Sequence, residues 1–233
     1  MTMPRPVRLF HITAIDNLEM ICQQGALLSK EKLSKTKDQQ LGLQYYNIAH
    51  AGAQGARAIK SVTNPPGGLV HEFVPFYFAP RSPMLSAIHH GQVQNCNYEQ
   101  ASIIYFETTI ELVRQNGMQD FVFYDRNATL DYSQCFTELK QLKNVVDWQT
   151  MTETPRLDGF CKYFMNTHAN PRYVDRVEKR QAEFLTKEQV PLNWITRIGV
   201  INAARAKEVN DILSDNNVNL IVDVMKDWYF LGQ

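Results

Sequence analysis

The chain lacks an excess of charge of either sign. Its 233 residues include 24 basic and 24 acidic side chains, so the formal net charge at pH 7 is zero. A neutral chain has no long-range field that would draw the whole molecule to nucleic acid or to an anionic membrane. Any site for a polyanion must therefore be a local patch of basic side chains.

Cysteine is scarce and dispersed. The chain has four cysteines, at Cys22, Cys96, Cys135 and Cys161. No two of them form a C-x-x-C pair, which argues against a disulfide framework and against a zinc site. His89 and His90 are adjacent and belong to no H-E-x-x-H motif. No bound metal is therefore expected.

Long hydrophobic runs are also missing. The first ten residues, MTMPRPVRLF, lack the apolar core of a signal peptide. No later segment has the length and hydrophobicity of a membrane-spanning helix. The chain also has no internal repeat, and it lacks the G-x-G-x-x-G and Walker motifs of Rossmann and P-loop nucleotide sites. These absences predict a reduced, soluble, cytoplasmic protein that does not associate with membranes.

What the chain does contain is enough apolar material for a sizeable core, since 44% of its residues are hydrophobic and 11% are aromatic. Periodicity predicts strands at 7–12, 74–80, 101–109, 120–125, 182–187, 195–201 and 219–224. It predicts helices at 16–25, 50–61, 82–91, 110–117 and near 203–214. This mixture follows no strict β-α-β rhythm, which favours an α+β fold over a doubly wound parallel sheet.

Two segments carry little pattern. Residues 29–47 are polar and are expected to form a long loop, and loops of that length in a compact domain are usually functional or disordered. Residues 126–178 are the least regular part of the chain.

Two polar residues lie at the end of the first predicted strand. His11 and Thr13 are two positions apart in the sequence F-H-I-T, so they project from the same face of a strand. One explanation is that this face lines a pocket. The other is a core histidine that hydrogen-bonds the backbone, as most buried polar groups do. On the residues alone, the second explanation is favoured.

Two arginines lie near predicted helices. Arg57 belongs to the helix expected at 50–61, where a solvated surface position is the ordinary explanation. Arg81 follows an aromatic strand and precedes a helix start, a place that favours anions. It could hold a phosphate or cap a loop.

A glutamate stands at the start of an apolar strand. Glu183, in the sequence A-E-F-L, is costly to bury unless its charge is paired or used. An ion pair with Arg180 or Lys187 would satisfy it. Alternatively, it could stabilise the positive charge of an oxocarbenium-like transition state. The residues alone leave these explanations even.

The segment around this glutamate mixes basic and aromatic side chains. Between residues 156 and 188, seven Lys or Arg residues stand against five Asp or Glu residues. The interleaved aromatic residues are Phe160, Tyr163, Phe164 and Tyr173. Stacking rings and cations are the components of a site for single-stranded nucleic acid. The excess of positive charge is small, so the pattern by itself is weak.

Several segments together resemble the DarT family of DNA ADP-ribosyltransferase toxins. In order, they are F-H-I-T with the N-L and G-x-L that follow, N-I-A-H followed by A-R, VPFYFAPRSPMLSAIHHG, and RQAEFLTKEQVPL. They extend from about residue 8 to about residue 200, and the runs PFYFAPRSPML and RQAEFL are quite specific. The resemblance is closest to the branch that modifies thymine in single-stranded DNA.

The resemblance implies a single domain over residues 1–233, with an ADP-ribosyltransferase-like α+β fold. Such a fold has a split, twisted β-sheet core with surrounding helices. The implied reaction transfers ADP-ribose from the co-substrate NAD to a thymine ring nitrogen and releases nicotinamide, with no metal. The implied partners are single-stranded DNA and a macrodomain antitoxin that removes the modification.

The resemblance also implies roles for individual residues. Glu183 and Arg57 match the catalytic glutamate and arginine of the family. The residues expected to bind NAD are His11, Ile12, Thr13, Asn17, Leu28, Asn47, His50, Tyr77 and Arg81. Those expected to bind DNA are Lys162, Tyr163, Arg176 and Arg180. Residues 34–56 fall where the family has an NAD-binding element, and residues 139–183 correspond to its substrate-recognition loop.

Two other functions are open on the sequence. One is an NAD-dependent transferase that acts on RNA or on another base, including one that removes a 2′-phosphate from spliced RNA. The other is a non-catalytic module that binds single strands through the basic and aromatic stretch and does not consume NAD.

Overall fold

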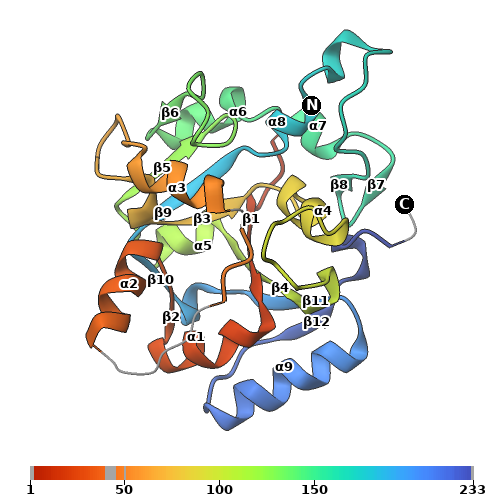
Figure 1. Cartoon of the computed structure of the whole chain (residues 1–233). Helices are drawn as coiled ribbons and strands as arrows, with labels where there is room; N and C mark the ends of the chain where they lie inside the picture. The colour runs from red at the N-terminus through yellow and green to blue at the C-terminus, as the bar shows by residue number, and fades with distance from the viewer. Residues whose placement is uncertain (1–2, 40–45, 50, 232–233) are drawn as a thin grey trace.

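The computed structural model describes residues 3–39, 46–49 and 51–231. Within them, eight strands form one sheet in the order β12-β11-β4-β1-β3-β9-β5-β6, and helices surround this sheet (Figure 1). Neighbouring strands pair antiparallel except β11 and β12, which are parallel. The α+β prediction is confirmed.

Every predicted strand is present, with its ends shifted by a few residues. The strands of the large sheet are β1 (Arg8–Ala14), β3 (Phe73–Tyr77), β4 (Ile103–Thr109), β5 (Phe121–Tyr124), β6 (Cys135–Phe136), β9 (Glu183–Lys187), β11 (Arg197–Val200) and β12 (Val222–Val224). Two small pairs stand apart from it: β2 (Ala26–Leu28) with β10 (Gln189–Pro191), and β7 (Arg156–Leu157) with β8 (Phe160–Cys161).

The five predicted helices also form. They are α1 (Leu18–Gln24), α3 (Ala51–Ile59), α4 (Pro83–His89), α5 (Ile110–Gln115) and α9 (Ala203–Asp215). The segment 126–178, predicted to be irregular, contains only short elements, among them α6 (Leu142–Val145), α7 (Trp148–Thr152) and the start of α8 (Arg176–Lys179). No helix in the described part of the chain is long and apolar enough to cross a membrane.

The prediction of one long loop over residues 29–47 is wrong for its first part. Residues Lys30–Gln39 form helix α2, because they are mostly good helix formers and the Ser29 hydroxyl accepts the Lys32 N–H at 3.2 Å as an N-cap. Leu33 is the one buried residue among residues 30–36. The apolar periodicity that identifies a helix was therefore missing. Residues 40–45 lie outside the described residues.

The sheet is split between β1 and β3. Strand β1 pairs with β4 along its whole length but meets β3 only at Phe10 and Tyr77. Beyond that pair, the Pro75 carbonyl points toward β1 and accepts from the His11 ring at 2.8 Å. A strand residue points its N–H and its C=O to the same side, so proline removes the donor that would have continued the β1–β3 ladder. The gap is thus encoded in the sequence.

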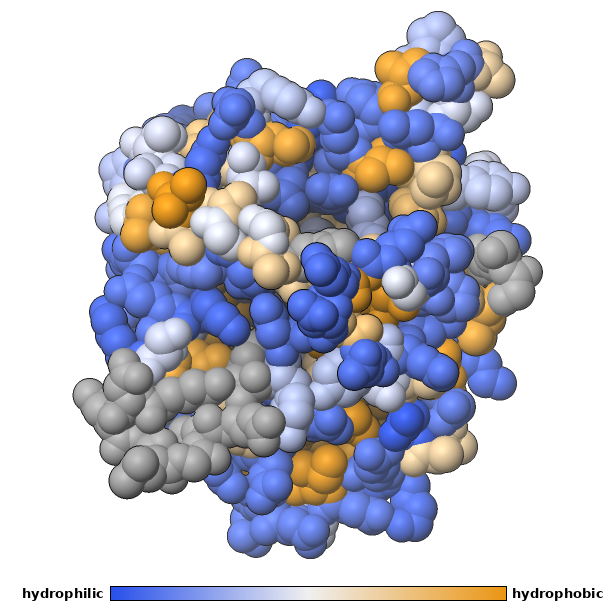
Figure 2. Space-filling view, viewed as in Figure 1, coloured by the Kyte–Doolittle hydropathy of each residue, from blue (hydrophilic) through white to orange (hydrophobic). Residues whose placement is uncertain are grey.

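The surface in the view of Figure 2 is mostly hydrophilic, with apolar side chains in separate small patches. The core beneath is rich in aromatic residues, and the C-terminal segment closes one side of it. Trp228 packs edge-on against Phe10 and Tyr105, with ring centroids 5.1 and 5.3 Å apart. Gly199 of β11 makes room for that indole, because a Cβ at this position would overlap the Trp228 ring.

We predict that Gly199→Ala lowers the free energy of unfolding by about 1–3 kcal/mol, the usual cost of overpacking a filled core. The control is Gly55→Ala, on the exposed side of α3, where a Cβ meets nothing within 4 Å. That change should raise stability by about 0.5–1 kcal/mol, because glycine weakens a helix interior. Urea denaturation measures both. Equal effects of the two substitutions would contradict the packing described here.

Candidate active site

A cavity of about 140 Å³ opens at the split of the sheet. Its walls come from β1, β3, β9, α2, α3 and residues 47–49, and Figure 1 shows α3 lying in front of β3 and β9. Pockets that enclose a whole drug-sized ligand measure about 300–1,000 Å³. This cavity therefore suits one end of a dinucleotide and leaves the other end outside.

Glu183 lies on the cavity wall at the first position of β9, and it is 2% exposed. It pairs in register with Tyr77 of β3 on one side and with Tyr124 of β5 on the other. The carboxylate thus faces the same space as His11 of β1. A buried carboxylate requires a compensating partner.

Arg57, in the last turn of α3, is that partner. Its Nη1 donates to both carboxylate oxygens of Glu183, each at 3.0 Å. Its Nη2 is buried and has no hydrogen-bond partner among the described residues. Leaving a charged donor buried and unsatisfied is costly. Because Arg57 lines the cavity, this N–H is a donor available to a ligand there.

The expected ion pair of Glu183 with Arg180 or Lys187 does not form. Arg180 donates to the Pro80 carbonyl at 2.7 Å, and Lys187 donates to the Gly67 carbonyl at 3.3 Å. The partner of Glu183 is instead Arg57, on a helix more than a hundred positions earlier. Spacing in the sequence could not identify this pair.

His11 both hydrogen-bonds the backbone and lines the cavity, so both explanations considered for it from the sequence apply. Its Nδ1 lies 2.8 Å from the Pro75 carbonyl, and its ring also lines the cavity. Burial lowers the pKa of His11 to about 4, with the Arg57 charge acting in the same direction against the Pro75 hydrogen bond. Because a carbonyl only accepts, Nδ1 carries the hydrogen of the neutral ring, and Nε2 keeps its lone pair.

Four other residues expected to bind NAD lie on the cavity wall: Ile12, Leu28, Asn47 and Tyr77. Tyr77 stands at the split, opposite both Phe10 and Glu183. Burial raises the pKa of Tyr77, and the Glu183 charge raises it further. The phenol therefore stays protonated and is able to donate a hydrogen bond.

Thr13 and Asn17 are fully buried behind the cavity wall. The Asn17 amide donates to the Thr13 hydroxyl at 2.8 Å and to the Tyr46 carbonyl at 2.9 Å, and it accepts the Tyr46 N–H at 2.7 Å. These bonds hold Tyr46, and with it Asn47, against β1. The two residues therefore position the wall and do not line it. His50 lies outside the described residues.

Arg81 does not line the cavity. Its side chain is fully buried, and it donates to the carbonyls of Cys161 at 3.0 Å, of Phe160 at 3.4 Å, and of Asp227. The guanidinium ties β8 to the C-terminal segment. Of the two roles considered for Arg81, the described contacts match a cap on backbone carbonyls, and its contact with NAD stays a prediction.

Four polar residues on the wall were not predicted: Lys30, Gln54, His71 and Asn127. Gln54 and His71 contact each other at 3.0 Å, and Asn127 follows β5. Gln54 precedes Arg57 by three positions on α3, so helical spacing could have indicated it. No pattern distinguished His71 or Asn127.

Two of the four residues expected to bind DNA line a second hollow, of about 590 Å³. They are Lys162 and Tyr163, and the Tyr163 side chain is 52% exposed. Helix α4 contributes to both, since Met84 lines the cavity and Ala87 lines the hollow. We call this hollow the α4 groove.

The other two residues, Arg176 and Arg180, are buried, and their contact with DNA stays a prediction. Arg180 is 1% exposed and Arg176 is 6% exposed. Arg176 donates to Glu153 at 2.8 Å, and its guanidinium lies 3.7 Å from the centroid of the Tyr173 ring. Both cations are used within the protein.

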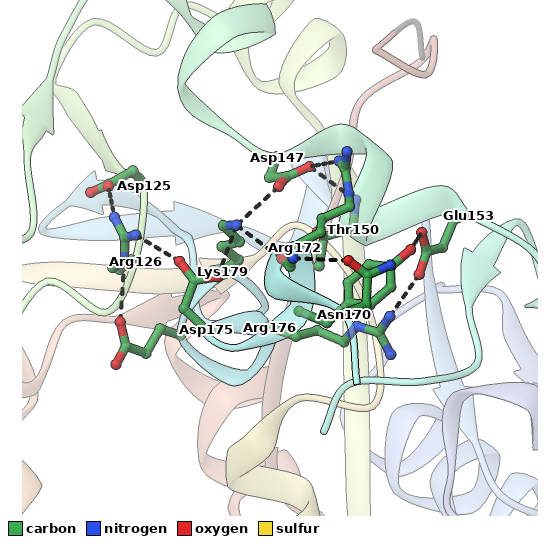
Figure 3. Close-up of polar contacts among 12 residues, drawn as sticks. Asp125, Arg126, Asp147, Thr150, Glu153, Asn170, Arg172, Asp175, Arg176 and Lys179 are labelled. Atoms are coloured by element: carbon green, nitrogen blue, oxygen red, sulfur yellow. Dashed lines mark hydrogen bonds and ion pairs between the residues drawn. The ribbon is translucent and has the colours of Figure 1, made fainter. Parts of the chain in front are cut away.

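Ion pairs also consume much of the remaining positive charge in this segment, as Figure 3 shows. Arg126 pairs with Asp175 at 3.1 Å. Lys179 bridges Asp175 at 2.9 Å and Asp147 at 3.5 Å, and Arg172 reaches Asp147 at 3.2 Å. The basic stretch is therefore largely neutralised from within, and its charges order the segment instead of presenting a cationic surface.

The donor set for a metal is absent in the part of the chain that the structure describes. No three His, Cys, Asp or Glu side chains there come together in a way that could hold an ion.

A histidine, a tyrosine and a buried glutamate around the split of an antiparallel sheet form the arrangement expected of an ADP-ribosyltransferase. The family model described as "ssDNA thymidine ADP-ribosyltransferase, DarT" matches residues 10–230. A DNA ADP-ribosyl transferase of Thermus sp. (strain 2.9) is 34% identical over 233 residues, which cover 98% of this chain and 99% of that protein. Its counterpart in Thermus aquaticus is 33% identical over 229 residues, covering 97% and 90%.

Solved structures agree. Thermus sp. 2.9 DarT in complex with ADP-ribosylated ssDNA matches with a TM-score of 0.82 at 32% identity, over 99% of both chains. The same protein in complex with NAD+ matches with a TM-score of 0.79 at 31% identity, over 98% of this chain and 100% of that one. The chain therefore belongs to the DarT family of single-stranded DNA thymidine ADP-ribosyltransferases. This confirms the resemblance to the thymine-modifying branch.

We predict that His11 stays neutral down to about pH 5, because its pKa lies at about 4 in the folded protein and at 6.5 when it is exposed. Between these values the unfolded chain binds one more proton than the folded one. The stability associated with neutral His11 is therefore lost as the pH falls from 6.5 toward 4. A pH titration of the ring proton shifts of the six histidines measures this. A His11 midpoint near 6.5 would contradict its burial.

Proposed function

We propose that this chain transfers ADP-ribose from NAD to a thymine base of single-stranded DNA and releases nicotinamide. The observation that carries the proposal is the Arg57–Glu183 pair in the cavity, with the second guanidinium nitrogen unpartnered. Membership of the family supports it. So do the two Thermus sp. structures, one with NAD+ and the other with ADP-ribosylated ssDNA.

The nicotinamide end of NAD fits the part of the cavity between β1 and β3. There, Nε2 of His11 offers an acceptor and the Tyr77 hydroxyl offers a donor. Glu183, on the next strand, accepts a hydrogen bond from a hydroxyl of the attached ribose. Asn47 and Leu28 border the same space.

Glu183 lowers the barrier through its charge. As the bond between ribose C1′ and the nicotinamide nitrogen breaks, its electron pair leaves with nicotinamide, and positive charge develops on the sugar. A fixed carboxylate in a dry site stabilises that charge without having to reorganise. Thymine N3 gives its proton to water, and the electron pair that it keeps forms the new bond to C1′.

Arg57 favours the reactive form of thymine. The imide nitrogen is a poor nucleophile until its proton departs, and a guanidinium that remains charged is a poor proton acceptor. Arg57 therefore acts by stabilising the thymine anion and not as a literal base. Its unpartnered Nη2 is the donor available for this contact.

The α4 groove suits the strand that flanks the target base. Tyr163 and Phe164 offer rings for stacking, and Lys162 offers a cation for phosphate. An unpaired strand is required because thymine N3 takes part in base pairing in a duplex and would first have to be extruded.

We further propose that the whole chain is one transferase domain acting as a cytoplasmic toxin. A macrodomain antitoxin that removes the modification would be its partner. The family match over residues 10–230 supports the single domain. An adduct on N3 prevents base pairing, which makes an enzyme that reverses it necessary for the survival of the host cell.

We predict that Glu183→Gln lowers the rate of modification by at least about 10²–10³-fold, the usual cost of removing one preorganised electrostatic contact. The assay is mass spectrometry of a short oligonucleotide with one thymine after exposure to protein and NAD, beside a thymine-free oligonucleotide. Glu188→Gln is the matched control, since this exposed glutamate lies just beyond the end of β9.

We predict that Arg57→Ala abolishes the mass gain of the oligonucleotide in the same assay. A separate measurement of NAD binding should show that much of the affinity for NAD persists.

Modification of the thymine-free oligonucleotide would overturn the proposed substrate. DNA binding without any consumption of NAD by the wild-type protein would favour the non-catalytic alternative.

We predict that Tyr163→Ala weakens the affinity for a single strand by about 5- to 150-fold, since one stacked base contributes about 1–3 kcal/mol. Tyr132→Ala is the control, because that ring is 58% exposed but lies outside the α4 groove. Fluorescence anisotropy measures both. The affinity should fall only gently with salt, with a slope of about −0.7 per neutralised phosphate. Equal losses of affinity in the two variants would show that the DNA strand does not bind in the α4 groove.

A further inference from the structure

Asn127 lies on the cavity wall on the opposite side of Glu183 from His11. The strand order β1-β3-β9-β5 places His11 on β1 and Glu183 on β9, and Asn127 follows the last residue of β5 by three positions. A base that displaces nicotinamide has to approach C1′ from the side opposite to the leaving group. With nicotinamide toward His11, the incoming base arrives on the side of Asn127.

The orientation of the Asn127 amide is fixed by its neighbours. Its Oδ1 accepts from the Thr129 N–H at 3.0 Å and from the Thr129 hydroxyl at 2.7 Å. A backbone N–H can only donate, so the oxygen must face Thr129 and the NH₂ group must point elsewhere. The structure gives that NH₂ group no partner within the described residues. It is a free, oriented donor in a half-buried position.

The same loop is attached to the catalytic carboxylate. The Ala128 N–H donates to Glu183 Oε2 at 3.4 Å, and Arg57 Nη1 reaches the same oxygen at 3.0 Å. The loop that carries Asn127 and the helix that carries Arg57 thus meet at one carboxylate oxygen. Both residues line the cavity, and Arg57 Nη2 is buried without a partner among the described residues.

We propose that the Asn127 NH₂ group donates a hydrogen bond to one of the two carbonyl oxygens that flank thymine N3, and that Arg57 Nη2 serves the other. This inference rests on the proposed function and assigns the source of its base selectivity. Thymine presents a ring N–H between two acceptors. Cytosine replaces one acceptor with an amino group, as guanine does beside its ring N–H, and adenine has neither carbonyl.

Two fixed donors therefore match thymine and uracil alone among the common bases. An amino group presented to either donor would leave that donor unpaired and bring two hydrogens together. Sites built on such hydrogen bonds reject the wrong ligand strongly, because their own polar groups lose their partners. Thr129 is the positioning residue, since its two bonds turn the amide toward the base.

The test pairs a protein change with a single-atom change in the base. Wild-type protein and Asn127→Ala are each given oligonucleotides whose only target is thymine, 2-thiothymine or 4-thiothymine, and kcat/KM for the oligonucleotide is measured at saturating NAD. For thymine, Asn127→Ala should lower kcat/KM by about 2- to 13-fold, the range of one neutral hydrogen bond. For one of the two thio-bases, the loss of kcat/KM caused by Asn127→Ala should fall below twofold. Sulfur is a weak acceptor, so the wild-type protein already lacks most of that hydrogen bond with this base.

Two further variants keep the result interpretable. Thr129→Val retains the backbone N–H but removes the hydroxyl donor, and it should reproduce the same dependence on the thio-bases with a smaller loss. Asn210→Ala, on the exposed side of α9, should change nothing. Thermal unfolding of each variant confirms that it is folded.

An equal loss on all three oligonucleotides, or a loss confined to the KM for NAD, would assign Asn127 to another role and overturn the inference. So would a loss below twofold on thymine itself. If the wild-type protein modified none of the oligonucleotides, the proposed function would fail first. If the wild type is active and the variant matches it, only the role of Asn127 falls.

Discussion

The buried pair of Arg57 and Glu183 is the interaction on which the rest of the site depends. It joins α3 to β9 on the cavity wall, at 3.0 Å to each carboxylate oxygen. A charge buried at 2% exposure is tolerable only with such a partner. In the proposed chemistry, the pair also holds the two catalytic side chains within one hydrogen bond of each other. Stability and activity are therefore coupled at this point.

The order of the strands gives the cavity two different ends, one on each side of the Arg57–Glu183 pair. His11 and Tyr77 form one end, at the split between β1 and β3, and Asn127 forms the other, beyond β9. The segment that follows Asn127 is ordered by ion pairs such as Lys179 with Asp175 (Figure 3). Many of the charged side chains therefore pair with one another inside this neutral protein. The number of Lys and Arg residues in the sequence overstated how many are available to contact DNA.

Much of the fold was predictable, because its strands and most of its helices carry clear apolar periodicity. Helix α2 did not, since Leu33 is the one buried residue among residues 30–36. In the site, Glu183 stood out because a carboxylate in an apolar strand is physically anomalous. Local sequence could not reveal that Arg81 and Arg180 would be consumed by backbone carbonyls. Nor could it indicate Asn127, whose importance arises from a neighbour two residues away and a strand far along the chain.

Pro75 has a consequence for how the cavity receives a ligand. With no N–H toward β1, and with its carbonyl held by His11, this position cannot close the two halves of the sheet into a continuous ladder. The gap is a product of folding and not of binding. An arriving dinucleotide breaks no strand pairing to enter, so little of its interaction energy is diverted into rearranging the receptor.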